Sequence, residues 1–235
     1  RISILVKDIT RRKQAEIALL RFQEGLTTLN QISFSQNMEV NEQIQEGLKL
    51  MLEYFHMSVG VVSKIEKDQY TPISLVSNEP ELNFKQDVTI PLDNTYCQRI
   101  WQRKYLVAER DLEQAEWAKN IGLAANHFRS FIGTIIQVEN QPFGAVSFFN
   151  QQPYPREFET YDFEFLRIFA RWISFVLEQE LQKNRLISIN QNKERIMDII
   201  AHDLRNPMGA VLGLAEYSLH MQDSSLSDSL KEVLQ

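Results

Sequence analysis

The last third of the sequence is dominated by one long helical pattern. From Phe158 to about Met221 there is no Pro before Pro207 and no Gly before Gly209. These two residues interrupt helices most strongly, so sixty-odd residues can continue as a rod of roughly 90 Å. Large apolar residues crowd its first half and are sparse over Glu178–Glu194. We therefore expect the first half to cover a sheet and a partner, and the thin middle to shift easily in register.

Apolar packing resumes at Ile196, where Ile199, Ile200 and Leu204 follow at helical steps. After Met221 we predict a turn at Ser224–Asp228. A second helix is then predicted over 226–235, and the chain stops within it.

A polar cluster stands beside this apolar stripe. His202 is off the stripe, Asp203 follows it, and Asn206 is four residues on, on the same helical face. Pro207 cannot donate a hydrogen bond to the carbonyl of Asp203, so a bend is expected here. A neutral imidazole is a nucleophile near pH 7, and an adjacent carboxylate can orient it. An isolated His-Asp pair would more simply be a solvated pair, so the wider string decides.

That string, from Asn192 to about Tyr217 and with H-D-L-R-N-P at its centre, resembles the phospho-acceptor helix of sensor histidine kinases. The resemblance implies that His202 takes a phosphoryl group from ATP and that Asp203 acts as general base or orienter. It implies that Asn206 positions water for the reverse phosphatase reaction and that Pro207 supplies the helix bend. The phosphoryl group would then pass to an aspartate of a response regulator.

The ATP in that reaction would be bound by a domain that this sequence lacks, since no Asp-x-Gly-x-Gly stretch follows the helix. We therefore expect the chain alone to show no autophosphorylation. The resemblance also implies a homodimer, with residues 181–235 as an incomplete dimerisation and histidine-phosphotransfer domain built as a four-helix bundle.

The N-terminal residues have two parts. Residues 1–10 resemble the end of a PAS domain, with a last strand at Ile2–Ile9. Residues 11–37 are predicted as a linker coiled coil, with a seam spaced four, three, four and three: Ala15, Leu19, Phe22, Leu26 and Leu29. The seam needs a partner helix, most simply its copy in a second subunit. The alternative is packing on its own domain.

The middle of the chain predicts an α+β domain with an antiparallel sheet. A helix is expected over 41–56, and a first hairpin over 58–65 and 70–76. Short helices are expected over 95–103 and from Asp111, where Asp111–Gln114 has the pattern of a capping box. A strand is expected over 105–108, a second hairpin over 131–138 and 143–149, and then the long helix.

This order, over residues 38–180, resembles a GAF domain. Four stretches carry the resemblance: Pro91–Trp101, Arg129–Ile136, Gly144–Asn150, and Phe158 with Asp162 and Leu166. Some GAF domains bind small molecules and others only dimerise, so the ligand stays open. Bilin attachment is disfavoured by Trp117-Ala118 where a Cys-His pair would stand. Cyclic-nucleotide binding is disfavoured by Gln151 and Phe163. Haem would need an axial ligand; for His56 and His127 we favour structural or surface roles.

Composition narrows the partners. The formal charge of −6 argues against a nucleic-acid surface, and no apolar run is long enough for a membrane span. Cys97 is the only cysteine, which suits a reducing compartment, and we favour a small buried residue over a redox thiol beside Arg99 or Arg103. We expect a cytoplasmic protein without a metal site. Arg1 stands where an initiator Met would, so we expect the chain to be a fragment.

The sequence therefore predicts a GAF sensor domain flanked by long helices that relays a signal to His202 in a two-component histidine kinase. The alternatives are a non-catalytic GAF module for dimerisation or ligand binding, and a regulatory GAF domain of a cyclic-nucleotide enzyme or transcription factor.

Overall fold

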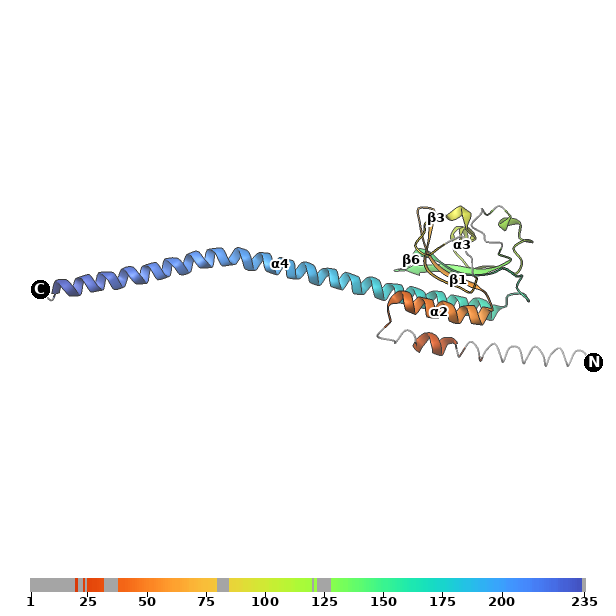
Figure 1. Cartoon of the computed structure of the whole chain (residues 1–235), viewed down its shortest axis with the longest axis horizontal. Helices are drawn as coiled ribbons and strands as arrows, with labels where there is room; N and C mark the ends of the chain where they lie inside the picture. Colours follow the sequence, from red (N-terminus) through yellow and green to blue (C-terminus); the bar gives the residue numbers. More distant parts are fainter. Residues whose placement is uncertain are drawn as a thin grey trace, which may run out of the picture. The chain divides into compact units, whose positions relative to one another are not determined.

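The computed structural model describes residues 20, 23, 25–31, 38–79, 85–119, 121 and 128–233 (Figure 1). The predicted end of a PAS domain at residues 1–10, the seam residues Ala15, Leu19 and Phe22, and His127 lie outside these residues. The chain divides into two units, residues 1–180 and residues 181–235, and each is described by itself.

The first unit is an α+β domain, as the sequence predicts. Its elements, in chain order, are α2 (Val40–Phe55), β1 (Val59–Glu66), β2 (Gln69–Ser77), β3 (Ile90–Pro91), η1 (Leu92–Asn94), α3 (Cys97–Arg103), β4 (Val107–Glu109), η2 (Glu116–Ala118), β5 (Ser130–Val138), β6 (Gln141–Asn150) and the first part of α4 (Thr160–Val233). The six strands form one antiparallel sheet in the order β3-β2-β1-β6-β5-β4.

Both predicted hairpins are present, and their turns explain the register. Lys67 and Asp68 connect β1 to β2 with φ of 50° and 60°, and Glu139 and Asn140 connect β5 to β6 with φ of 52° and 62°. Two successive residues with positive φ match the twist of paired strands. The β5–β6 turn is therefore tighter than the sequence indicates, and Pro142 lies within β6.

Helices cover the two faces of the sheet unequally. In Figure 1, α2 and the first part of α4 lie together along one face, and α3 lies on the other. Neighbouring residues of β6 show the division: Phe148 packs with α2 and α4, whereas Phe149 packs with α3. Successive strand side chains point to opposite faces, so one strand supplies both cores.

Leu26 and Leu29, the described part of the linker seam, pack on their own domain. Residues 25–31 are helical, and Leu29 is 2% exposed within the core formed by α2 and α4. For these residues the alternative interpretation of the seam is the correct one.

Two local predictions are wrong. Asp111–Gln114 opens no α-helix, and turns and the short η2 follow. The Asp111 carboxylate still accepts the Glu113 N–H, but two hydrogen bonds from Arg129 tie this segment to the start of β5. The turn at Ser224–Asp228 is also absent, since α4 continues to Val233. Residues 214–233 contain neither Gly nor Pro, and Ser or Asp disfavours a helix by less than about 1 kcal/mol each.

Candidate functional site

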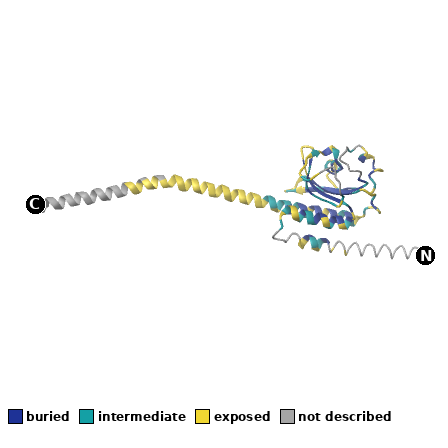
Figure 2. Cartoon of the chain, in the orientation of Figure 1, coloured by how far each residue is buried: buried dark blue, intermediate teal, exposed yellow. Residues whose placement is uncertain are grey.

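His202 lies in the second part of α4, on an exposed stretch of helix. Figure 2 shows this part as exposed, in contrast to the buried first part. The side chains of His202 and Asp203 are 73% and 72% exposed, and Nδ1 of His202 lies 3.2 Å from Oδ1 of Asp203. With the proton on Nδ1, the imidazole donates to the carboxylate and Nε2 keeps its lone pair. This arrangement can present a nucleophilic nitrogen to an incoming electrophile.

An apolar stripe lies on the opposite face of the helix. His202 is two positions from both Ile200 and Leu204, and at about 100° per residue two positions give roughly opposite directions. In this part of α4 the large apolar residues whose side chains the structure describes are about half exposed or more: Leu186, Ile187, Ile189, Ile196, Met197, Ile199, Ile200, Leu204, Met208, Val211 and Leu212. The helix thus offers a polar chemical face and an apolar packing face.

The other two predicted site residues share the helix. Asn206 is helical, and its side chain lies outside the described residues. Pro207 is exposed inside α4, which continues past it. The bend that we expect there stays a prediction.

The α3 face of the sheet is packed with aromatic side chains. The Tyr96 ring contacts those of Phe131 and Phe149, at 5.7 and 6.1 Å between centroids, and Trp117 closes on Tyr96 edge-on at 6.1 Å. Phe128 stacks on Phe149 at 4.8 Å. Trp117 occupies the position at which bilin-binding GAF domains carry a Cys-His pair, and in this chain it packs against Tyr96.

Cys97 is fully buried on this face. Its thiol donates to Ser147 Oγ at 3.5 Å, and burial raises its pKa to about 11 although the hydrogen bonds with Ser147 and Tyr70 oppose this. Burial also raises the pKa of Tyr70, whose side chain hydrogen-bonds with Ser63, Cys97 and Ser147. A redox thiol would be exposed and partly ionised, so the redox interpretation of Cys97 is disfavoured and the interpretation as a buried residue is supported.

His56 and Asp162, two residues weighed for ligand binding, have structural positions. His56 is exposed and caps α2 in the left-handed conformation, with φ of 52°. Asp162 is fully buried at the start of α4, where it accepts hydrogen bonds from Arg156 at 2.6 and 2.9 Å and from the Glu159 N–H at 2.8 Å. In the described part of the chain, no group of three or more His, Cys, Asp or Glu residues is arranged to hold a metal ion.

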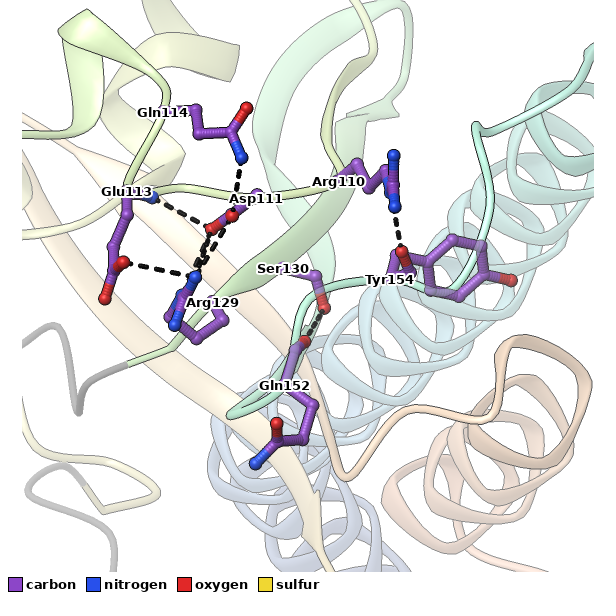
Figure 3. A network of polar contacts seen from close by, with 8 residues as sticks. All are labelled: Arg110, Asp111, Glu113, Gln114, Arg129, Ser130, Gln152 and Tyr154. Carbon is purple, nitrogen blue, oxygen red and sulfur yellow. Dashed lines mark hydrogen bonds and ion pairs between the residues drawn. The ribbon is translucent and has the colours of Figure 1, made fainter.

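A polar network fastens the connection between β4 and β5 (Figure 3). Arg129 donates to both carboxylate oxygens of Asp111 at 3.0 Å and lies 3.1 Å from Glu113. Burial opposes the ionisation of Asp111, but the hydrogen bonds from Arg129, Glu113 and Gln114 outweigh it and hold its pKa below the usual value. This network anchors the segment that carries Trp117.

Sequence reasoning missed three contacts: the partner of Asp162, the Arg129–Asp111 pair, and the close approach of Gly25 to Phe165. An added Cβ at Gly25 would lie 2.4 Å from Phe165 Cζ. The capping pattern at Asp111 was a signal for its role as an acceptor. The other contacts join residues whose spacing carries no pattern.

A family model for the GAF domain matches residues 39–177. Three solved structures illustrate the likeness. The GAF domain of Acinetobacter phosphoenolpyruvate-protein phosphotransferase has a TM-score of 0.56 at 14% identity, covering 72% of this chain and 98% of that one. Free methionine-R-sulfoxide reductase from Neisseria meningitidis, in complex with its substrate, has 0.56 at 13%, covering 69% and 91%. A phycoerythrobilin-bound GAF domain from a cyanobacterial phytochrome has 0.58 at 12%, covering 70% and 98%.

At these identities the structures show a shared fold. No curated protein sequence matches the chain. Among the described residues, no helix combines the length and the apolar character that a membrane crossing needs.

Proposed function

The chain belongs to the GAF domain family, and from this premise we propose that its GAF domain is the regulatory part of a sensor histidine kinase whose phospho-acceptor is His202. The observation that carries the proposal is the exposed His202–Asp203 pair, opposite an apolar stripe on a helix that begins in the GAF core. A phospho-acceptor must be reached by a nucleotide-binding domain and then by a second protein. A side chain that is 73% exposed meets this requirement.

The proposed reaction starts with attack of His202 Nε2 on the γ-phosphorus of ATP. An N–P bond forms, the bond from the γ-phosphorus to the bridging oxygen breaks, and ADP leaves with that electron pair. Asp203, on Nδ1, holds the ring in the reactive tautomer and stabilises the positive charge that develops on it. The phosphoryl group then moves from the phosphoramidate to a carboxylate oxygen of a response-regulator aspartate, which returns His202 to its neutral form.

The proposal includes a homodimer, because the exposed apolar stripe is stable only when it is buried against another apolar surface. A second copy of the helix carries the same stripe and can bury it. Apolar side chains repeated at helical steps along two such helices bury each other in a paired or four-helix arrangement. ATP would come from a nucleotide-binding domain outside this sequence, and the reaction is proposed for the cytoplasm, where ATP and response regulators meet. Asn206 and Pro207 keep the roles that the resemblance gives them.

The test is labelling of this chain by a separately supplied histidine-kinase nucleotide-binding domain with γ-labelled ATP. We expect an acid-labile, alkali-stable label that His202→Gln removes. His56→Gln is the matched control, since His56 is an exposed histidine at the end of α2 and lies outside the proposed site. Asp203→Asn should lower the labelling rate by about 10²-fold or more, the usual size of an acid–base contribution. An acid-labile label that survives in His202→Gln would refute the assignment.

A second candidate function is ligand binding by the GAF domain without phosphotransfer. The fold shared with the bilin-bound and substrate-bound structures favours it. A ligand between α3 and the sheet would have to displace Tyr96, Phe131 or Phe149, whose rings already pack together. Native mass spectrometry of the purified chain tests this function, and a stoichiometric bound molecule would favour it.

A further inference from the structure

We propose that the close seat of Gly25 on the Phe165 ring couples the helical segment 25–31 to the first turns of α4, so that docking of this segment regulates the helix that carries His202. The regulation of His202 rests on the proposed function. The coupling itself does not, because it concerns contacts within residues 25–180.

The contact at Gly25 leaves no room for a Cβ unless the Phe165 ring moves. Gly25 is buried, and an ideal Cβ there would lie 2.4 Å from Cζ of Phe165 and 3.2 and 3.3 Å from its two Cε atoms. The ring tip therefore points at the backbone of the segment. One turn on, Leu29 is 2% exposed within the core of α2 and α4. These two residues hold the segment against the domain.

Phe165 links the segment at Gly25 to the first turns of α4. The residue is fully buried from solvent, and it lines a pocket together with Gly25 and Tyr54, so its ring can be displaced by a side chain at position 25. Its ring meets that of Tyr54, from α2, edge-on at 4.4 Å. Among the described residues, the buried Tyr54 hydroxyl has no hydrogen-bond partner, and burial, followed by the nearby Asp162, raises its pKa. A buried polar group without a partner is unfavourable, so the docked arrangement is less stable than its apolar contacts alone would make it.

Asp162 lies three residues before Phe165 and fixes the first turn of α4. It joins Arg156 and the Glu159 N–H, so the helix start is tied to the loop after β6. A shift of Phe165 therefore acts one helical turn from this anchor and directly beside the Tyr54 ring. From this turn α4 runs as one helix through His202.

The test compares the wild-type chain with Gly25→Ala and Asn30→Ala by hydrogen exchange. Asn30 is on the same segment and exposed, so it is the matched control. Ala is the better helix former, and propensity alone would slow exchange in Gly25→Ala. We expect instead about tenfold faster exchange in residues 25–31 and in residues 164–170 of α4. Asn30→Ala should stay within about twofold of wild type.

A rescue variant separates the specific contact from general damage. Phe165→Leu removes Cζ, the atom that the new methyl group would meet. The double variant Gly25→Ala/Phe165→Leu should therefore exchange like Phe165→Leu alone in residues 25–31. Faster exchange confined to residues 25–31 in Gly25→Ala would overturn the coupling. So would unchanged exchange in both regions.

The second readout is the initial rate of His202 labelling in the assay described above. We expect Gly25→Ala to change it by at least about threefold relative to Asn30→Ala. An equal rate, together with faster exchange in α4, would overturn the regulation while leaving the contact. Failure of the wild-type chain to label would count against the proposed function, and the exchange data would still decide the coupling.

Discussion

Replacing Arg156 by Met should destabilise the GAF domain more than replacing Asp162 by Asn, although the two residues form one ion pair. The Asp162 side chain is fully buried and that of Arg156 is 39% exposed. Arg156→Met leaves a buried carboxylate with only the Glu159 N–H. Losing one partner of a fully buried ion pair lowers the free energy of unfolding by about 3–5 kcal/mol. Because water reaches Arg156 and screens the pair, we expect a loss of about 3 kcal/mol for Arg156→Met.

Asp162→Asn leaves the opposite residue behind. The guanidinium of Arg156 reaches water and keeps its contacts with the Tyr154 and Tyr161 rings at 5.4 and 5.2 Å. The amide oxygen still accepts one hydrogen bond, so we expect a loss of about 1–2 kcal/mol. The double variant should also lose less than Arg156→Met, because no buried charge remains.

Urea unfolding at pH 7 followed by tryptophan fluorescence measures these differences. All three tryptophans, Trp101, Trp117 and Trp172, lie within residues 38–180, so the signal reports this unit. Equal losses in the two single variants, or a larger loss in Asp162→Asn, would refute the asymmetry.

Three further predictions concern other sites. Cys97 should react with a disulfide reagent at least about 100-fold more slowly than in urea, since burial raises its pKa to about 11 and hides the thiol; fast native labelling would contradict this. The free energy of unfolding should fall as the pH drops below about 4, because the pKa of Asp111 is lowered in the folded state and its ionised form contributes stability only above that range; in Asp111→Asn this part of the pH dependence should disappear. Gly144→Ala should cost more than about 3 kcal/mol, because its Cβ would lie 1.8 Å from the Ser63 carbonyl oxygen, whereas Gly209→Ala, with nothing within 4 Å, should leave the circular dichroism melting curve unchanged or raise its midpoint.

The elements that sequence predicts well are those whose pattern is set locally. The two hairpins follow from alternating residues around short polar turns, and α2 follows from an apolar stripe that runs from Ile44 through Leu48 to Phe55. Their bounds differ from the prediction by a few residues. The GAF interpretation depends on the order of these elements, and that order survives small errors at their ends.

The contacts that sequence misses are set by residues far apart. The capping pattern at Asp111 is real, but Arg129 takes the carboxylate, and no helix forms. Leu26 and Leu29 fit a coiled-coil seam and a domain core equally well, because both need apolar residues at the same spacing. The burial of Leu29 in the domain core and the close approach of Gly25 to Phe165 tell the two apart, and neither contact has a signal in the sequence.

The distribution of apolar residues along α4 gives the two proposals a common basis. Up to Val176 the helix buries residues such as Phe165, Phe169 and Ile173 in the domain, and that packing maintains it. From Gln182 onward every residue with a described side chain is exposed. A helix in water gains little stability from its backbone alone, and most helical stability in proteins comes from packing an apolar face. The stripe around Ile200 and Leu204 is therefore where stability must be gained through the second copy that we propose. The stability gained by pairing with the second copy is gained outside the GAF core. A small change in packing where α4 leaves this core can therefore alter how the two copies pair. Under this condition, docking of the segment at Gly25 would regulate His202.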